Sequence, residues 1–413
     1  MFATASRLMV LVGLLGLSLA GLASCGRSEV DTLAPTTLNL WPGSASANEG
    51  EFVALAAGKY IVRYRGQWEP QSNPERRLGY VAPPGGFAAY SPDQQRVALT
   101  MLREHGREVY VYLYDHLRYQ IWAGVATYGS YIPMPLAARF DGDKLQVVSA
   151  LARRGGDTVE RLGYDLTVLS DTVRSDWFPS AARVAEVTTP APLPLPSDYV
   201  AAAFLGGQPL CVALAGTGQV WRWRPGQPRD FDSCLPVSAV AAQAGSEATA
   251  RQTRFRLITT VQEGPVFAAG ALPAAAGQPG ATLVWRIPAS GPPQFVGAVR
   301  PPAGATDQLL ELVARADGQG WAEVWGSPVS SDDPVPPTPD GRLFLAGPHF
   351  EAPQAVEVAG RAVQNPSWAP RGDRLYFVVG GTEVWSWDKR QGAQLVAEAP
   401  PLAGLLEKTA PHL

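Results

Sequence analysis

The stretch that decides the fold runs from Ser91 to Asp115 and reads SPDQQRVALTMLREHGREVYVYLYD. It opens with Ser-Pro-Asp, which favours a turn because proline presets φ and aspartate tolerates turn geometry. Residues 96–102 are apolar and partly β-branched, and residues 109–114 alternate valine or leucine with tyrosine, which is the two-residue period of a strand. The stretch therefore predicts a turn, a strand, a loop and a second strand.

The same unit returns near the C-terminus, where residues 368–388 read WAPRGDRLYFVVGGTEVWSWD. A Val-Trp or Val-Tyr strand marks further units, with centres near residues 60, 110, 161, 220, 284, 324 and 384. A four-stranded propeller blade takes ~40–50 residues, and the steps between these centres lie at or above that length. We therefore predict an all-β chain that forms a β-propeller of seven blades. Six blades is the alternative because residues 309–359 do not divide cleanly, and a pair of β-sandwiches is the other architecture considered.

Two pairs of segments carry a family resemblance: SPDQQRVAL with EVYVYLYD, and WAPRGDRLYFV with TEVWSWD. They resemble the WD-like propeller repeats of the TolB type found in bacterial periplasmic proteins, and residues 338–345 are a third, partial match. The sequence departs from the usual form at Gln94-Gln95, where Asp-Gly is typical, and at Arg371-Gly372-Asp373. The resemblance implies the propeller fold, and no partner of that family is carried over.

The composition is that of a folded chain, with 46% hydrophobic and 17% charged residues. Its 42 glycines and 38 prolines predict many turns and few long helices. The formal net charge is −3, and no run is rich in lysine and arginine. Because a nucleic-acid partner needs a basic face, we predict that the protein binds no nucleic acid.

The N-terminus resembles a bacterial lipoprotein signal. Arg7 is the only charge before an apolar run over residues 8–23, which ends in the lipobox-like sequence Leu22-Ala23-Ser24-Cys25. The resemblance implies cleavage before Cys25 and acyl chains on it, which together anchor a protein stably. We predict a signal peptide over residues 1–24, a flexible lipid-anchored tether over 25–38 and the propeller domain over 39–413. The alternative is an ordinary cleaved signal with a chance cysteine.

This signal assigns the protein to the bacterial cell envelope, either at the outer membrane or at the outer face of the cytoplasmic membrane. Export places the remaining cysteines, Cys211 and Cys234, in an oxidising compartment, where we predict a disulfide between them. The alternative is a pair of separate thiols. Their spacing, without a CxxC motif or a nearby histidine, is not that of a zinc site.

The search for chemistry finds no GxSxG nucleophile motif and no HExxH metal motif. His105, His116 and His349 all fall in predicted loops or turns. We therefore predict no catalytic residue, no metal and no cofactor. Aromatic residues recur at similar places in the repeats, and we predict that they pack between blades: Trp221, Trp223, Trp285, Trp325, Trp385 and Trp387.

These observations favour a lipid-anchored envelope propeller that acts as a non-catalytic binding or scaffolding module for a protein, peptide or glycan. An assembly factor for outer-membrane proteins would be built in the same way and would differ only in its partner. The alternative from another class is an envelope hydrolase or lyase that uses carboxylates of the channel or a bound metal. Neither the residues of a ligand site nor the ligand can be predicted from these patterns.

Overall fold

The described residues of the computed structural model form strands, two helices and several turns. The described residues are 39–42, 52–56, 59–64, 67–70, 80–81, 88–91, 96–103, 108–115, 119–127, 131–141, 144–155, 158–170, 199–205, 211–215, 220–223, 231–259, 264–273, 280–302, 308–327, 341–358, 360–369 and 371–398. Within them, no helix is both long enough and apolar enough to cross a membrane.

The described strands form seven antiparallel sheets that follow one another along the chain. The first sheet contains β1 (Asn39–Pro42), β2 (Phe52–Ala56), β3 (Lys59–Tyr64) and β4 (Gln67–Pro70). The second contains β5 (Tyr80–Val81), β6 (Ala88–Tyr90), β7 (Arg96–Arg103), β8 (Glu108–Asp115) and β9 (Tyr119–Thr127). The third contains β10 (Tyr131–Asp141), β11 (Lys144–Gly155) and β12 (Thr158–Ser170).

Each of the last four sheets has four strands in the order of the sequence. The fourth contains β13 (Tyr199–Phe204), β14 (Cys211–Ala215), β15 (Val220–Trp223) and β16 (Phe231–Ser233). The fifth contains β17 (Arg254–Thr259), β18 (Val266–Ala271), β19 (Thr282–Ile287) and β20 (Gln294–Val299). The sixth contains β21 (Gln308–Ala314), β22 (Trp321–Gly326), β23 (Arg342–Ala346) and β24 (Gln354–Ala355). The seventh contains β25 (Val363–Trp368), β26 (Arg374–Val379), β27 (Glu383–Asp388) and β28 (Gly392–Glu398).

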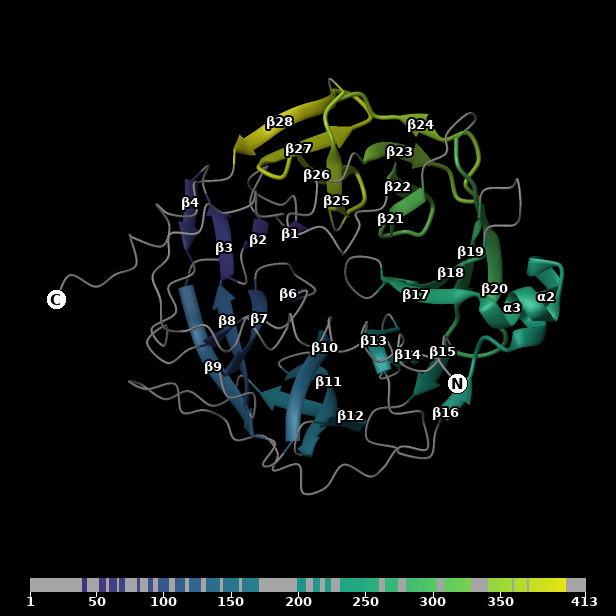
Figure 1. Ribbon diagram of the computed structural model, residues 1–413. Helices are drawn as coiled ribbons and strands as arrows, with labels where there is room; N and C mark the ends of the chain where they lie inside the picture. The colour runs from purple at the N-terminus through teal and green to yellow at the C-terminus, as the bar shows by residue number, and fades with distance from the viewer. Residues whose placement is uncertain are drawn as a thin grey trace.

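The sheets are arranged around a common centre, with the first strand of most sheets innermost and the last strand on the outside (Figure 1). The innermost strands β10, β13, β17 and β21 each contact the innermost strand of the next sheet along the chain, and β1 of the first sheet contacts β25 of the seventh. This is the arrangement of a β-propeller, in which radial repetition leaves only short sheet edges exposed.

Apolar side chains fill the spaces between neighbouring sheets. One buried cluster joins the fourth and fifth sheets through Val220, Val266 and Trp285. A second joins the fifth and sixth sheets, where the rings of Phe267 and Trp321 meet edge to face at 4.7 Å between centroids. A third joins the sixth and seventh sheets. Because the fifth and sixth sheets are each buried on both faces, their inner strands β18 and β22 read as nearly continuous buried runs rather than as a strict alternation.

Partly buried arginines also connect the sheets. Arg63 of β3 donates a hydrogen bond from Nη2 to the carbonyl of Val396 in β28, which joins the first sheet to the seventh at 3.2 Å. Arg222 of β15 donates from Nη1 to the carbonyl groups of Pro288 and Gly291 at 3.1 and 2.8 Å, which joins the fourth sheet to the fifth. A charged donor on a carbonyl makes a stronger hydrogen bond than a neutral pair.

The predicted turn-and-strand units are confirmed at both ends of the repeat series. β7 and β8 match residues 96–102 and 108–114, and β26 and β27 match the second quoted unit. The marker strand is third along its sheet in six of the seven sheets, but in the sixth sheet it is the second strand, β22. The third strand there is β23, which the sequence analysis took as the opening of a further unit. This difference explains the short and long steps on either side of residue 324.

Two short helices precede the fifth sheet and were not predicted. The first is α2 (Val237–Ala244), which ends at Gly245 in the left-handed conformation, and the second is α3 (Glu247–Gln252). Ser246 caps α3, because its hydroxyl accepts a hydrogen bond from the amide of Thr249 at 3.1 Å. The helices are too short to display a long amphipathic period, and their alanine-rich sequence favours helix through intrinsic propensity alone.

The predicted disulfide between Cys211 and Cys234 is not supported by the structure. Cys211 pairs with Trp223, three residues along β14 from Leu214, whereas the amide of Cys234 donates to the carbonyl of Val220, which is the partner of Leu214. Two strand spacings and three residue rises separate the two cysteines, or roughly 14 Å. A disulfide needs Cα atoms about 4.4–6.8 Å apart. Cys234 is a buried thiol that donates to the carbonyl of Val220 at 3.4 Å.

Candidate functional site

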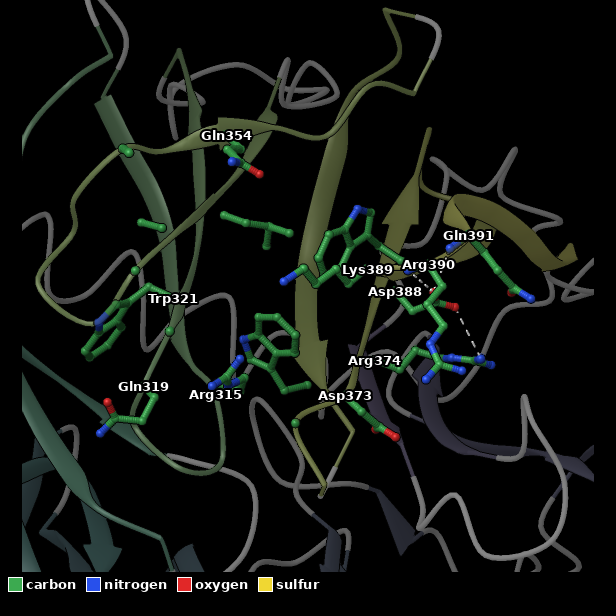
Figure 2. A pocket seen from close by; sticks show the side chains of 18 residues that line it. Arg315, Gln319, Trp321, Gln354, Asp373, Arg374, Asp388, Lys389, Arg390 and Gln391 are labelled. Atoms are coloured by element: carbon green, nitrogen blue, oxygen red, sulfur yellow. Dashed lines mark hydrogen bonds and ion pairs between the residues drawn. The ribbon is translucent and has the colours of Figure 1, made fainter.

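A pocket of about 860 Å³ opens between the sixth and seventh sheets and is the best candidate for a functional site. Tight turns that enter or leave β21 to β28 surround it (Figure 2). In that view, Gln319 and Trp321 of the sixth sheet lie on one side, and Asp388, Lys389 and Gln391 of the seventh lie on the other. Its lining consists of Arg315, Gln319, Gly320, Trp321, Leu345, Ala346, Gly347, Ala352, Gln354, Trp368, Gly372, Asp373, Arg374, Trp387, Asp388, Lys389, Arg390 and Gln391.

The turn between β21 and β22 is held by Asp317. Its carboxylate accepts two parallel hydrogen bonds from Arg315, at 2.8 Å from Nε and 2.7 Å from Nη2, and a third from the amide of Gln319 at 2.8 Å. The hydrogen bond from Arg315 is the main reason why the pKa of Asp317 lies below its usual value. A planar guanidinium matches a carboxylate in this two-point geometry, so the side chain of Arg315 is held in place at the pocket wall.

The turn between β27 and β28 is held in the same way by Asp388. Its Oδ1 accepts hydrogen bonds from the amides of Arg390 and Gln391, both at 2.8 Å, and its Oδ2 lies 3.5 Å from Nη2 of Arg374. The amide of Gln391 is the largest cause of a lowered pKa at Asp388, and the charges of Arg374 and Arg390 contribute further. This carboxylate is therefore ionised at neutral pH and fixes the turn that carries Lys389 and Arg390.

Tryptophans form the deeper part of the pocket. Trp321 is fully buried between Phe267 and Phe350, and its indole N–H donates to the carbonyl of Pro348 at 3.1 Å. Trp368 is only 4% exposed, and its indole N–H has no hydrogen-bond acceptor among the described residues. Trp387 is half-buried at the end of β27. The floor is thus rigid and aromatic, while the rim is polar and charged.

A second group of charged side chains lies on the innermost strands and connects three sheets. Arg256 of β17 donates to the carbonyl of Leu310 in β21 at 3.0 Å, and Glu311 of β21 accepts a hydrogen bond from the amide of Asn365 in β25 at 2.9 Å. Burial lowers the pKa of Arg256 and raises that of Glu311, and their mutual attraction opposes both shifts. Asn365 adopts φ 49°, a left-handed conformation that asparagine tolerates better than most residues.

The Glu-Val-Trp sequence recurs in β22 and β27 with the same internal contact. The indole of Trp325 donates to Oε2 of Glu323 at 2.8 Å, and the indole of Trp385 donates to Oε2 of Glu383 at 2.8 Å. Burial raises the pKa of Glu323 to about 7, against which the Trp325 hydrogen bond acts. Arg361 and then Trp385 lower the pKa of Glu383. The repeat therefore places one carboxylate in a protein core and its counterpart near the surface.

The structure separates the residues that the sequence analysis had singled out. Trp285 and Trp325 are buried between sheets as predicted, whereas Trp387 also lines the pocket. His349 lies in an exposed turn as predicted, with Nδ1 2.9 Å from the carbonyl oxygen of Val296 in the fifth sheet. His105, His116, Cys25 and the predicted signal peptide lie outside the described residues. In the part of the chain that the structure describes, no three metal-binding side chains come together.

No pattern in the sequence predicted a pocket between the last two repeat units. Asp373 was predicted to lie in the opening turn of a repeat unit and Asp388 to end that unit, and no role was predicted for Lys389, Arg390 or Gln391. A weak signal was present, since several turns of the last two sheets carry an aspartate near an arginine or a glutamine. That signal describes a turn, and only the packing of two sheets shows that these turns face one space.

Comparison with known proteins adds information about the fold. No family model matches the sequence, and no curated protein sequence matches it significantly. The structure is similar to the apo form of prolyl oligopeptidase B from Galerina marginata, with a TM-score of 0.50, 8% identity and coverage of 88% of this chain and 51% of that chain. It is also similar to a prolyl endopeptidase, with a TM-score of 0.51, 9% identity and coverage of 96% and 54%.

A third similar structure is the β-propeller domain of Myceliophteria thermophila Cps50 (Swd1), with a TM-score of 0.42, 11% identity and coverage of 76% of this chain and 85% of that chain. The chain spans about half the length of the prolyl oligopeptidase that it matches. At these identities the likeness concerns the fold alone. The radial arrangement of the described sheets is itself that of a β-propeller.

Proposed function

We propose that this protein is a non-catalytic binding module of the bacterial cell envelope, and that it holds a protein, peptide or glycan in the pocket between its sixth and seventh sheets. The observation that carries the proposal is the pocket itself, a space of about 860 Å³ lined by tryptophans, amides and charged side chains. Concave sites with a few convergent polar groups are the usual places for ligands. Rigid turns on a β-scaffold also suit binding, because little conformational freedom is lost when a ligand is held.

The lowered pKa of Asp388 favours binding over acid–base catalysis by this pocket carboxylate. A general acid or base works best when its pKa lies near the operating pH. Asp388 is shifted the other way, because the amides of Gln391 and Arg390 and the charge of Arg374 lower its pKa. The ionised carboxylate of Asp388 instead holds the backbone of the turn that carries Arg390 and Gln391.

The proposed location of the protein and its lipid anchor are supported by the sequence alone. We propose that residues 1–24 are removed, that Cys25 carries the acyl chains, and that residues 25–38 connect the lipid to a seven-bladed propeller over 39–413. The lipobox-like residues before Cys25 support the anchor. The seven described sheets and the contact between β1 and β25 support seven blades around one axis.

Binding in the pocket is tested by co-purification from native membranes after mild crosslinking. The full chain is compared with a pocket variant, Gln354→Ala with Gln391→Ala, and with Arg371→Ala, which changes an exposed residue of the neighbouring turn that does not line the pocket. Bound material is identified by mass spectrometry and by sugar analysis. We expect wild type and Arg371→Ala to retain the same material and the pocket variant to lose it. Equal recovery with all three proteins would show that the pocket is not the site.

The anchor is tested separately by the mass and location of the mature protein. Wild type is expected to carry acyl mass and to sediment with membranes, whereas Cys25→Ser is expected to lose both properties. An unchanged mass and location in the variant would remove the lipid anchor from the proposal without affecting the pocket.

One observation favours the alternative of a hydrolase or lyase that uses a channel carboxylate. Glu311 lies on an innermost strand, and burial raises its pKa, as the general acid of such an enzyme requires. The full chain is therefore incubated with fragments of envelope glycan, and the products are examined by mass spectrometry. Products that form with wild type and are absent with Glu311→Gln would replace the binding function by catalysis.

A further inference from the structure

The pocket has a charge opposite to that of the whole chain. Four cationic side chains line it, namely Arg315, Arg374, Lys389 and Arg390, against the two carboxylates of Asp373 and Asp388. The lining carries two more positive than negative charges, and one more when Asp317, which pairs with Arg315, is included, whereas the chain has a net charge of −3. Lys389 and Arg390 lie exposed at the tip of the turn that Asp388 holds. A local positive potential in a chain of opposite sign selects an anionic ligand.

The buried wall of the pocket contains a hydrogen-bond donor, the indole N–H of Trp368, that has no acceptor among the described residues. Trp368 lines the pocket and is 4% exposed. In the same pocket, the indole of Trp321 is satisfied by the carbonyl of Pro348. A buried donor without a partner lowers stability. The indole nitrogen is itself buried, so a ligand oxygen accepts from it once a neighbouring side chain moves aside.

Amide side chains surround the opening. Gln319, Gln354 and Gln391 come from three separate turns or strand ends and lie on different sides of the pocket in Figure 2. Each amide offers both donors and an acceptor, which is the requirement for binding hydroxyl groups. Trp387 contributes a half-buried indole of a size that suits one sugar ring. The other two indoles of the lining, Trp321 and Trp368, are buried and offer little open surface to the side chains of a peptide.

We propose that the pocket binds an acidic carbohydrate through a carboxylate-bearing sugar unit. The carboxylate lies near Lys389 and Arg390, the hydroxyl groups pair with the glutamine amides and Asp373, and a ring or carboxylate oxygen accepts from the indole of Trp368. This inference rests on the proposed function, because it names the ligand class of the same site. An acidic peptide shares the charge but not the regular array of hydroxyl groups.

The test uses isothermal titration of the full chain with three probes of equal length: an oligogalacturonate, a neutral galactose oligomer and an oligoglutamate peptide. We expect the oligogalacturonate to bind, both other probes to bind at least about tenfold more weakly, and binding to weaken as salt is raised. Lys389→Gln and Arg390→Gln are each expected to weaken binding by about two- to fivefold. Trp368→Phe keeps an aromatic side chain but removes the indole N–H donor. It is expected to weaken binding by about fivefold.

Arg371→Gln is the matched control, because it removes one exposed positive charge from the turn between β25 and β26 at a position that does not line the pocket. It is expected to leave the affinity unchanged. The acidic-sugar proposal falls if the peptide or the neutral oligomer binds as tightly as the oligogalacturonate, or if Arg371→Gln weakens binding as much as Arg390→Gln. If the pocket variant loses the co-purified material but the oligogalacturonate does not bind to wild type, the acidic-sugar proposal is wrong while the proposed function stands. Retention of native material by the pocket variant would instead overturn the proposed function.

Discussion

At the scale of single residues, Glu323 and Glu383 show how position in a repeat decides the behaviour of a carboxylate. Each is the first residue of a Glu-Val-Trp sequence, and each accepts a hydrogen bond from the indole of the tryptophan two residues later. Glu323 is 1% exposed, and burial raises its pKa to about 7. Glu383 pairs with Arg361 at 2.6 Å, and its pKa is lowered. The same local sequence thus makes opposite contributions to the pH dependence of stability.

Glu323→Gln is expected to raise stability at pH 8 and to flatten its pH dependence. The pKa of Glu323 rises on folding from 4.5 to about 7, so the folded chain binds more protons between these values. The stabilising contribution of the protonated form is complete below pH 4.5 and is lost as the pH rises through about 7. Glutamine keeps an acceptor for Trp325 without the charge, and we expect a gain of up to about 3 kcal/mol at pH 8.

The measurement is urea unfolding of the full chain at pH 5 and at pH 8. Glu383→Gln is the matched control and has the opposite sign: its lowered pKa stabilises the fold above the unfolded value, and this contribution is lost as the pH falls. A Glu323→Gln protein that is less stable than wild type at pH 8 would show that the buried carboxylate is ionised and needed.

Cys211 and Cys234 are expected to remain as thiols in the purified protein. The strand register places them roughly 14 Å apart, too far for a disulfide. Cys234 is also buried, so a thiol reagent should reach it only after unfolding. The check is a thiol titration without reductant, before and after denaturation. Failure of either cysteine to react in the denatured, unreduced chain would indicate the disulfide that the sequence predicted.

At the scale of elements, the turns around the pocket depend on backbone conformations as well as on carboxylates. Gly372 lies in the turn between β25 and β26 with φ 70°, and a Cβ atom built on it would stand 2.7 Å from Cγ of Arg315. Gly392, the first residue of β28, has φ 73° and nothing within 4 Å of such an atom. The two glycines therefore share the backbone requirement and differ in their surroundings.

Gly372→Ala is expected to weaken ligand capture more than Gly392→Ala does, although both variants lose about 1 kcal/mol of stability from a strained φ. The added methyl group at position 372 displaces Arg315, which is held at the pocket wall by Asp317. Stability is followed by thermal unfolding, and capture by the co-purification assay described above. Equal capture by the two alanine variants would mean that the position of Arg315 does not matter for binding.

Much of the element-scale structure could be predicted from the sequence, because local chemistry decides it. Alternation in residues 109–114 and the turn residues before β7 and β26 are sufficient to define those strands. Residues 338–345 were predicted to open a separate unit, whereas β23 is the third strand of the sixth sheet. The proline-containing sequence between β22 and β23 resembles the start of a new unit. The pocket could not be predicted, because Trp368 and Gln319 meet only through the packing of two sheets.

At the scale of the whole molecule, the contact between the first and seventh sheets determines whether the repeats act as one body. Arg63 in β3 donates to the carbonyl of Val396 in β28, and β1 lies against β25. The seventh sheet, which supplies half of the pocket, is therefore supported from both sides. An array that ended freely at β28 would leave this sheet with one packed face.

Arg63→Met is expected to destabilise the protein by about 1–3 kcal/mol, because it removes a charged donor from a partly buried carbonyl. Arg251→Met is the control, since Arg251 is 66% exposed beside Glu247 on α3, and exposed pairs of this kind contribute at most about 1 kcal/mol. Both variants are measured by urea unfolding. A larger loss from Arg251→Met than from Arg63→Met would contradict the role given to the contact between the first and last sheets.

The most direct test of the binding function is site-specific photocrosslinking in living cells of the native host. A photoreactive phenylalanine derivative replaces Gln391 at the pocket or, as the control, Leu395, which is 49% exposed on β28 and does not line the pocket. We expect a discrete crosslinked species to form from position 391 and not from position 395. A species that forms equally from both positions, or only from position 395, would contradict the central claim that the pocket between the sixth and seventh sheets holds the ligand.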